Sequence, residues 1–284
     1  MKCAWQAYLR LLPLWMRERV DMLGSESLQE LRLRINRLPQ MVMKDSVQYL
    51  EYPTTADDLK YTINAASQYS PWASTTISRG YITAQGGHRV GICGSVSIVD
   101  GKLNTVSDVT SLCIRVARDI QGLAVKALEL PGSLLIIGSP GSGKTTLLRD
   151  LARLRANSGD GAVAVVDERQ ELFPIVNGQF CFAAGDELDV LSGCGKQSGI
   201  EMMIRTMNPR WIVMDEITGS EDCHALIHAG WCGVSILATA HAGNMKDLMR
   251  RPVYKPLIQS GIFEHVLVMQ PDKSWNHEEV NKCS

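Results

Sequence analysis

The sequence lacks any long apolar run. Within its 284 residues, no uninterrupted hydrophobic stretch approaches the ~20 residues that a membrane-spanning helix requires. The N-terminal segment carries Trp5, Tyr8 and Trp15, but Arg10 and Pro13 interrupt it and no small-residue cleavage site follows. We therefore predict neither a direct membrane span nor a signal peptide, so that work at a membrane would depend on a partner protein.

An excess of either charge is also missing. The 29 basic residues oppose 30 acidic residues, and the formal net charge is −1. Bulk charge therefore gives no reason to expect that the protein wraps nucleic acid or lies on an anionic membrane. Binding of nucleic acid would require a local basic patch.

Paired cysteines are absent as well. The eight cysteines are scattered without a C-x-x-C pair, which excludes a disulfide framework and indicates a reduced, cytoplasmic protein. His224 and His228 lie four residues apart on an expected helix, near Cys223 and Cys232. Because this group lacks the acidic partner of the metalloprotease pattern and a paired-cysteine motif, we interpret the histidines as solvated residues, or as residues one contact removed from a site, rather than zinc ligands.

The hydrophobic residues that are present predict two domains. A content of 45% can bury a sizeable core, and the length is comfortable for two domains. Near residues 120–122 the pattern changes from strands with tight turns to buried strands that alternate with helices. We predict a smaller mixed α/β domain at 1–119, a joint at 120–122 and a second domain at 123–284.

Local patterns indicate the main elements of the first domain and the end of the chain. Apolar residues at helical spacing predict a helix at 3–23 that ends at Gly24. Thr55 and Asp58 form a capping-box pattern that predicts a helix start. The polar tail at 271–284 is expected to be loose.

The sequence pattern of the second domain predicts an α/β fold of the P-loop NTPase class, RecA- or AAA-like. Apolar strands that alternate with helical segments are typical of a parallel sheet covered on both faces. The expected strands are residues 134–137, 163–166, 211–214, 234–238 and 266–269.

The segment GSPGSGKT at residues 138–145 matches the phosphate-loop pattern G-x-x-x-x-G-K-[ST], between an expected strand and an expected helix. Its glycines allow positive φ angles, so that backbone amides and a helix N-terminus face a polyphosphate. Lys144 would reach the β- and γ-phosphates of ATP, and the Thr145 hydroxyl would bind Mg²⁺. The expected nucleotide-binding residues are Gly138, Ser139, Pro140, Gly141, Ser142, Gly143, Lys144, Thr145 and Thr146.

A second nucleotide motif is expected where an apolar strand ends in Asp215 and Glu216. The spacing of about 70 residues from the phosphate loop and the shared sheet make this acid pair significant. Asp215 would hold Mg²⁺ through water, and Glu216 would orient or deprotonate the attacking water. Because a pure binding module needs no such base, Glu216 favours hydrolysis.

Two other strand ends carry polar residues toward the same edge of the sheet. Glu168 is the expected second carboxylate of the site, with Asp167 and Glu171 as alternatives. Either Thr239 or His241 could sense the γ-phosphate.

The combined motifs resemble the stage III sporulation AA family, which belongs to the wider group of secretion ATPases of type II and type IV secretion and pilus machines. The similarity runs over essentially the whole chain, and the GGHRVG block makes it specific. The blocks that carry it are TISRGYIT at 76–83, GGHRVG at 86–91, SLCIRVAR at 111–118, GSPGSGKTTLLRDLAR at 138–153, VDER at 166–169, DVLSGC at 189–194, MIRTM at 203–207, DEI at 215–217 and ATAH at 238–241.

The resemblance implies a cytoplasmic ATPase of the mother cell that forms a homohexameric ring. Its partners would be membrane proteins of a sporulation channel to the forespore, which would hold it peripherally at the membrane. Residues 167–171 are similar to the group's aspartate box and His241 to its histidine box. Arg89 and Arg115 lie on the strands that supply trans-acting arginines in the group. One departure is Ile217-Thr218-Gly219, where the group carries an arginine.

Three other functions compete with an ATPase that powers the assembly of a channel or transport through it. A kinase would need an arginine-rich lid, which is missing between residues 156 and 162. A nucleic-acid-stimulated ATPase would need a basic, aromatic-rich face, and only Arg32, Arg34 and Arg37 form a small cluster. A non-hydrolysing, nucleotide-gated scaffold is disfavoured by Glu216.

Overall fold

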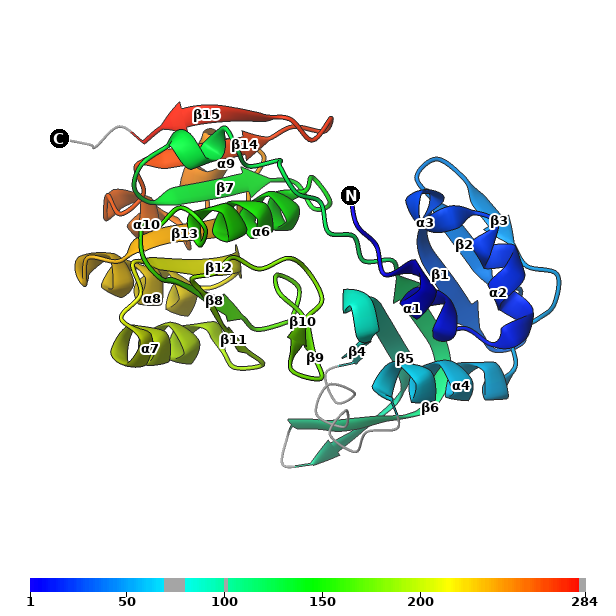
Figure 1. Ribbon diagram of the computed structural model, residues 1–284. Helices are drawn as coiled ribbons and strands as arrows, with labels where there is room; N and C mark the ends of the chain where they lie inside the picture. Colours follow the sequence, from blue (N-terminus) through cyan, green and yellow to red (C-terminus); the bar gives the residue numbers. More distant parts are fainter. Residues whose placement is uncertain (69–79, 100–101, 281–284) are drawn as a thin grey trace. The chain divides into compact units, whose positions relative to one another are not determined.

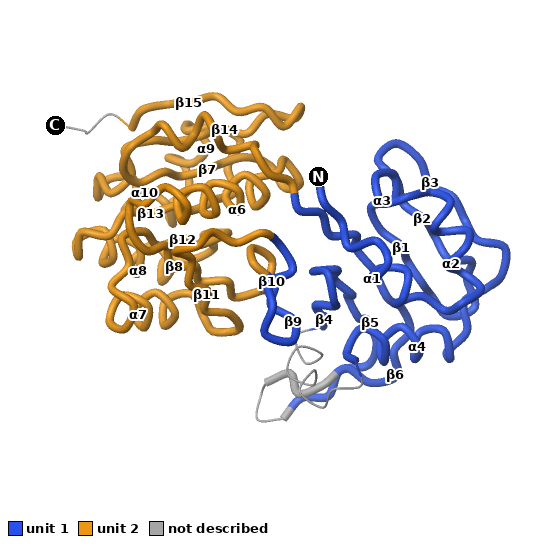
Figure 2. Tube along the Cα trace, viewed as in Figure 1, with its two compact units in different colours: residues 1–119, 174–182 blue, residues 120–173, 183–284 orange. Residues whose placement is uncertain are grey.

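The computed structural model describes residues 1–68, 80–99 and 102–280. The chain divides into two compact units (Figure 2). Unit 1 comprises Met1–Asp119 and Pro174–Phe182, and unit 2 comprises Ile120–Phe173 and Ala183–Ser284. Part of the TISRGYIT block, at 76–79, lies outside the described residues.

Unit 1 is built on an antiparallel sheet in the order β3-β2-β1-β6-β5-β4 (Figure 1). Leu31, Leu33 and Ile114 turn to one face of the sheet and are buried against Tyr8 and Leu12 from the helical layer. The strands are β1 (Leu28–Arg34), β2 (Gln40–Met43), β3 (Val47–Tyr49), β4 (Tyr81–Thr83), β5 (Arg89–Val99) and β6 (Lys102–Arg115); the helices are α1 (Trp5–Arg10), α2 (Leu14–Asp21), α3 (Gly24–Ser27), α4 (Ala56–Ser67) and the 3₁₀ turn η2 (Gln85–Gly87).

The prediction of a single helix at residues 3–23 is wrong. The segment forms α1 and α2 instead, and Pro13 caps the start of α2. Proline has no N–H to donate and disfavours helical backbone at the residue before it, so it separates two helices here. Gly24, with φ of +73°, opens α3 and does not end the preceding helix.

The capping box at the start of α4 is confirmed. The Asp58 amide donates to Thr55 Oγ1 at 3.2 Å, and the Thr55 amide donates to Asp58 Oδ2 at 2.8 Å. Each side chain thus satisfies a backbone N–H of the first helical turn.

Unit 1 also contains a short hairpin that comes from far along the sequence. Strands β9 (Ile175–Val176) and β10 (Gln179–Phe180) pair within the segment that the sequence analysis placed in the second domain. The Asn177 side-chain amide donates to Gln68 Oε1 at 3.0 Å. Phe182 packs so closely on Gly87 that a Cβ atom there would lie 2.9 Å from the ring.

Unit 2 contains a mixed α/β fold with the sheet order β11-β8-β12-β13-β7-β14-β15 (Figure 1). All neighbours are parallel except β14 and β15. The strands are β7 (Leu134–Gly138), β8 (Val163–Asp167), β11 (Leu188–Ser192), β12 (Trp211–Ile217), β13 (Ser235–His241), β14 (His265–Met269) and β15 (Trp275–Glu279); the helices are η3 (Ala127–Glu129), α6 (Lys144–Arg155), α7 (Lys196–Met207), α8 (Ser220–Trp231), α9 (Met245–Arg250) and α10 (Lys255–Gln259).

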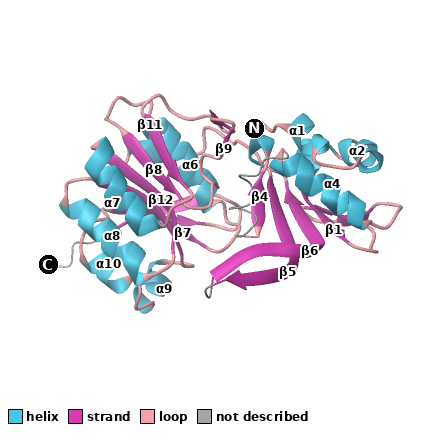
Figure 3. Ribbon diagram, turned by 90° about the horizontal axis from the view of Figure 1, so that it is seen from below, coloured by secondary structure: helices cyan, strands magenta, loops and turns pink. Residues whose placement is uncertain are grey.

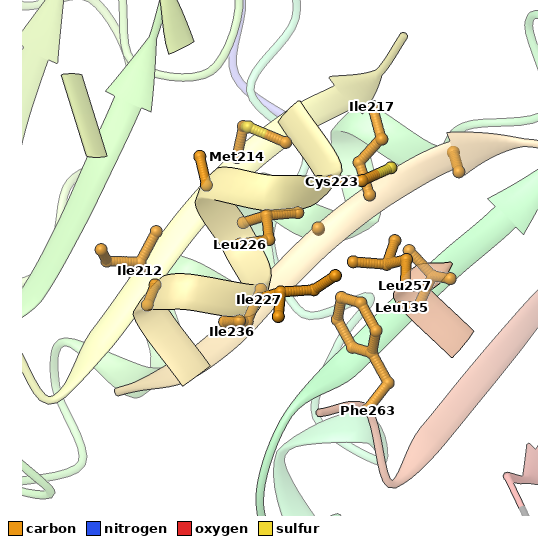
Figure 4. Packing of buried hydrophobic residues seen from close by; sticks show 14 of the residues in the cluster. Leu135, Ile212, Met214, Ile217, Cys223, Leu226, Ile227, Ile236, Leu257 and Phe263 are labelled. Atoms are coloured by element: carbon orange, nitrogen blue, oxygen red, sulfur yellow. The ribbon is translucent and has the colours of Figure 1, made fainter. Parts of the chain in front are cut away.

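Helices cover both faces of this sheet (Figure 3). Leu134 and Ile136 of β7 belong to the core cluster that contains α6, whereas Leu135 and Ile137 belong to the cluster that contains α8 and α10. Figure 4 shows the second cluster, in which Leu226 of α8 packs among strand residues. Burial of each such side chain contributes about 1.5–3 kcal/mol.

The prediction of a loose tail at residues 271–284 is wrong for the central part of this segment. Residues Trp275–Glu279 form β15, which pairs antiparallel with β14 at the edge of the sheet. Its side chains are mostly polar and exposed, so that hydrophobic periodicity does not reveal it. Residues 281–284 lie outside the described part. In the described part of the chain, no helix has the length and apolar character needed to cross a bilayer.

Candidate nucleotide site

The phosphate loop connects β7 to α6 and turns its lysine back on the loop itself. Lys144 is buried, and its Nζ donates to the carbonyl oxygens of Gly138 at 3.0 Å and Ser139 at 2.9 Å. Gly141 and Gly143 have φ angles of +75° and +100°, which favour glycine. The glycine backbone conformations therefore set the path of the loop, and the Lys144 ammonium is bound by the loop carbonyls.

An oxygen-rich pair lies beside the loop. Thr145 Oγ1 donates to Asp215 Oδ2 at 2.7 Å, and the buried Thr239 hydroxyl donates to Asp215 Oδ1 at 2.5 Å. Hydroxyl and carboxylate oxygens are the ligand atoms that Mg²⁺ prefers. Ser142 Oγ is buried and has no hydrogen-bond partner among the described residues. The residues present fit a magnesium–nucleotide complex held at Thr145 and Asp215.

A β-bulge brings both neighbouring acids to one site. Consecutive side chains of a regular strand point to opposite faces, yet Asp215 contacts Thr239 while Glu216 approaches His241. The register between β12 and β13 shifts between Met214 and Ile217, and Glu216 has a φ of +57°. Bulges of this kind re-aim side chains beside active sites.

Glu216 is held at its backbone and at its carboxylate. Its amide donates to Thr239 Oγ1 at 2.7 Å, and Arg169 donates to its Oε2 at 3.0 Å. His241 Nε2 lies 3.3 Å from Oε1, and Lys144 Nζ lies 3.2 Å from His241 Nδ1. Because an ammonium can only donate, His241 accepts at Nδ1 and donates from Nε2 to Glu216. The imidazole thus links the phosphate-loop lysine to the acid.

The site is partly desolvated. Burial lowers the pKa of Lys144, and the negative charges of Asp215 and Glu216 oppose this shift. A cation in such surroundings interacts more strongly with a polyphosphate than it would in bulk water.

The three acidic alternatives after β8 have different surroundings. Asp167 is buried, and its carboxylate accepts the backbone N–H groups of Glu171, Leu172 and Phe173 at 2.8–3.0 Å. Burial raises the pKa of Asp167 to about 6, although these N–H donors act in the opposite direction. Asp167 therefore anchors the turn. The carbonyl of Glu171 accepts from Arg149 of α6 at 2.7 Å.

Glu168 faces a basic residue, Lys196. Its Oε2 lies 4.0 Å from Lys196 Nζ. Glu168, Asp215, Glu216 and Lys196 all line a pocket of about 20 Å³. This volume accommodates about one water molecule.

The two candidate interface arginines belong to unit 1, and their role at a nucleotide stays a prediction. Arg89 and Arg115 are directly opposite each other on β5 and β6. Arg89 stacks over the Tyr81 ring at 3.9 Å, and Arg115 Nε lies 3.2 Å from Glu30 Oε1. The Arg115 side chain is nevertheless 63% exposed. Like charges opposite each other destabilise a sheet, and Glu30 supplies an anionic partner to Arg115 here.

The histidines of α8 are exposed, whereas Cys223 is buried and donates to the Val253 carbonyl at 3.2 Å. Burial raises the pKa of Cys223 to about 11, and a protonated thiol is a poor metal ligand. Within the described ranges, no group of three or more His, Cys, Asp or Glu residues could hold a metal ion.

The sequence motifs assign no role to Arg149, Arg169 or Lys196. Arg149 and Arg169 lie inside blocks that carry the family resemblance, and Lys196 lies outside them. The partners of all three come from distant segments. No periodic or spacing signal distinguishes such residues from solvated ones.

The fold and the site together define a class. The architecture is similar to that of the ATPase DotB of Legionella pneumophila, with a TM-score of 0.58 and 17% identity over 94% of this chain and 80% of that chain. It is also similar to the pilus retraction motor PilT with bound ADP, with a TM-score of 0.61 and 13% identity over 88% of this chain and 76% of that chain. The chain thus has the P-loop fold of the secretion ATPases.

The sequence comparison is more specific. The model of the family described as "Sporulation stage III, protein AA" matches residues 6–279, and the chain belongs to this family. Stage III sporulation protein AA of Bacillus subtilis (strain 168) is 38% identical over 256 residues, which cover 87% of this chain and 83% of that protein. The resemblance expected from the motifs is therefore confirmed.

Proposed function

We propose that this chain is an Mg²⁺-dependent ATPase that powers the assembly of a sporulation channel, or transport through it, between mother cell and forespore. The observation that carries the proposal is the β12 bulge, which holds Glu216 beside the Asp215–Thr145 pair. A site that only bound nucleotide would not need a second acid in a strained backbone conformation. Family membership supports the sporulation context.

The residues suggest a division of labour in hydrolysis. Lys144 and the loop amides would bind the phosphates, and Mg²⁺ held at Thr145 and Asp215 would neutralise negative charge on them. A water molecule in the pocket between Glu168 and Glu216 would lose its proton to, or be oriented by, Glu216 during in-line attack on the γ-phosphate. His241 would keep the Glu216 carboxylate oriented toward Lys144.

The assembly proposed is a homohexameric ring in the mother-cell cytoplasm. Arg89 and Arg115 would reach a nucleotide held by a neighbouring subunit, where such arginines typically contribute about 10³–10⁵ in rate. Membrane proteins of the stage III channel complex would bind the ring and hold it peripherally at the membrane. The ATPase class of the structural neighbours supports this arrangement.

The test is Mg²⁺-dependent phosphate release, measured with light scattering across a range of protein concentrations. Glu216→Gln should lower kcat by about 10²–10⁴-fold while nucleotide binding persists, because it removes the base. Glu278→Gln, on the exposed edge strand, is the matched control and should behave as the wild type. A wild-type chain that binds ATP without releasing phosphate would instead be a nucleotide-gated scaffold.

A further inference from the structure

Lys196 is a partly buried cation outside every recognised motif. It is the first residue of α7, and only 9% of its side chain is exposed. Burial of an ammonium group is costly unless it is paired and hydrogen-bonded. The partners of Lys196 therefore indicate why the chain keeps a cation here.

Those partners come from three segments around the proposed water site. Lys196 Nζ donates a short hydrogen bond to the backbone carbonyl of Glu216. It lies 3.5 Å from Asp222 Oδ2 in α8 and 4.0 Å from Glu168 Oε2 after β8. Asp222 Oδ2 in turn accepts the Thr218 amide at 2.8 Å and the Thr218 hydroxyl at 3.0 Å. One cation thus ties the end of β12 to helix α8 and to the segment after β8.

The contact with the Glu216 carbonyl acts where the backbone is strained. A non-glycine residue with φ of +57° persists only where surrounding contacts hold it. Thr239 holds the Glu216 amide and Lys196 holds its carbonyl. The two contacts bracket the bulge that brings Glu216 to the site.

Lys196 and Glu168 also line two adjoining pockets. One is the pocket of about 20 Å³ at the acids, and the other is a polar pocket of about 400 Å³ lined by Ser198, Glu201 and Asp222 among others. Lys196 and Glu168 are thus both part of the wall of the water-sized pocket. Loss of the cation would remove this contact of Glu168 and leave like-charged carboxylates near one another.

We propose that Lys196 is a positioning residue for the acids that activate water. Its ammonium fixes the bulged conformation of Glu216 through the carbonyl and holds Glu168 in the wall of the water-sized pocket. The inference rests on the proposed ATPase function, which it deepens, and it gives Lys196 no contact with the nucleotide.

The test compares Lys196→Met, Lys196→Gln and Lys196→Arg with the exposed control Lys246→Met of α9. We expect Lys196→Met to lower kcat by about 10²-fold, the scale of a misplacement of about 1 Å. KM and the Kd for a fluorescent, non-hydrolysable ATP analogue should stay within about threefold, because the phosphate loop is untouched. Lys196→Arg, which restores the charge, should recover most of the lost rate.

Amide hydrogen exchange in the nucleotide-free chain gives a readout independent of catalysis. In Lys196→Met, exchange should accelerate in the segment around Glu216 and Thr218 and stay unchanged in α6. If Lys196→Met does not fold, Lys196→Gln takes its place, since it keeps a hydrogen-bond donor.

Three outcomes would overturn the inference. The first is an unchanged kcat in a folded Lys196→Met chain, and the second is a loss of nucleotide binding as large as the loss of turnover. The third is unchanged exchange in the segment around Glu216 and Thr218. A wild-type chain without ATPase activity would overturn the proposed function alone, and the exchange comparison would then decide the positioning role by itself.

Discussion

At the scale of single residues, Thr239 joins the two acids of the second nucleotide motif. Its hydroxyl bonds Asp215 Oδ1 and accepts the Glu216 amide, and it is fully buried. From its place at a strand end, Thr239 is expected only to sense the γ-phosphate. Its contacts orient the Asp215 carboxylate and hold the backbone of Glu216, whatever it does toward a nucleotide.

Thr239→Val tests this role. The substitution keeps the side-chain shape but leaves the Glu216 amide unpaired, so the free energy of unfolding should fall by about 1–3 kcal/mol. If the proposed function holds, kcat should fall as well, because the Asp215 carboxylate and the backbone of Glu216 both lose a contact that holds them. Thr239→Ser, which keeps the hydroxyl, is the control. Equal kcat values for the two variants would argue against the orienting role.

His88 gives unit 1 a dependence on pH. The side chain is fully buried, accepts from the Ala117 amide at 3.0 Å and donates to the Ala4 carbonyl at 3.0 Å. Burial lowers the pKa of His88 from 6.5 to about 4, and the hydrogen bond to Ala4 opposes this shift. The folded state therefore binds fewer protons than the unfolded state. The contribution of His88 to stability is present above pH 6.5 and is lost as the pH falls toward 4.

We expect unit 1 to be about 2 kcal/mol less stable at pH 4.5 than at pH 7 on account of His88. In His88→Gln this difference should shrink, because glutamine does not titrate. Amide hydrogen exchange of unit 1 at the two pH values measures it, with the exposed His228→Gln as the control. An equally steep pH dependence in His88→Gln would assign the effect to other groups.

At the scale of elements, the central strands of unit 2 could be predicted because they are buried on both faces. β7, β8 and β13 read as continuous apolar runs, and the glycines of the phosphate loop mark the turn after β7. The edge strands β11 and β15 were missed, since partly exposed strands carry mixed residues. Their presence depends on hydrogen bonds to a neighbour, which sequence periodicity does not record.

The residues of the site likewise divide into those that a local pattern reveals and those that depend on long-range contacts. The phosphate loop and the acid pair are local patterns, so the sequence located Lys144 and Glu216. The bulge in β12 depends on contacts of Glu216 with Thr239 and Lys196, which lie 23 and 20 positions away. Long-range contacts of this kind decide how a motif is oriented, and a single sequence does not reveal them.

We predict that β15 protects the edge of the sheet from association with other chains. Its removal by truncation after Gln270 would expose the backbone edge of β14, a template for pairing with other chains. We expect the truncated chain to associate at concentrations where the intact chain does not, and to melt at a lower temperature. Light scattering and thermal unfolding measure both effects. Truncation after Val280 keeps β15 and is the control; if the two truncated chains behave alike, β15 has no protective role.

At the scale of the whole molecule, the proposed ring requires that the catalytic groups come from two subunits. Glu216 lies in unit 2 and Arg115 in unit 1. If a site combines Glu216 of one subunit with Arg115 of the next, each single variant removes one half of it. Glu216→Gln and Arg115→Ala should then both be inactive as pure proteins, for different reasons.

Mixing the two inactive variants tests the shared site directly. In rings assembled from equal amounts, about a quarter of the interfaces pair an intact Glu216 with an intact Arg115, because each is supplied by half of the subunits. ATPase activity should therefore reappear on mixing, to about a quarter of the wild-type rate. Glu216→Gln mixed with a Glu216→Gln/Arg115→Ala chain is the control and should stay inactive. Absence of recovery, with mixed rings present by light scattering, would mean that each site is complete within one subunit, and Arg115 would then be a structural residue that pairs with Glu30.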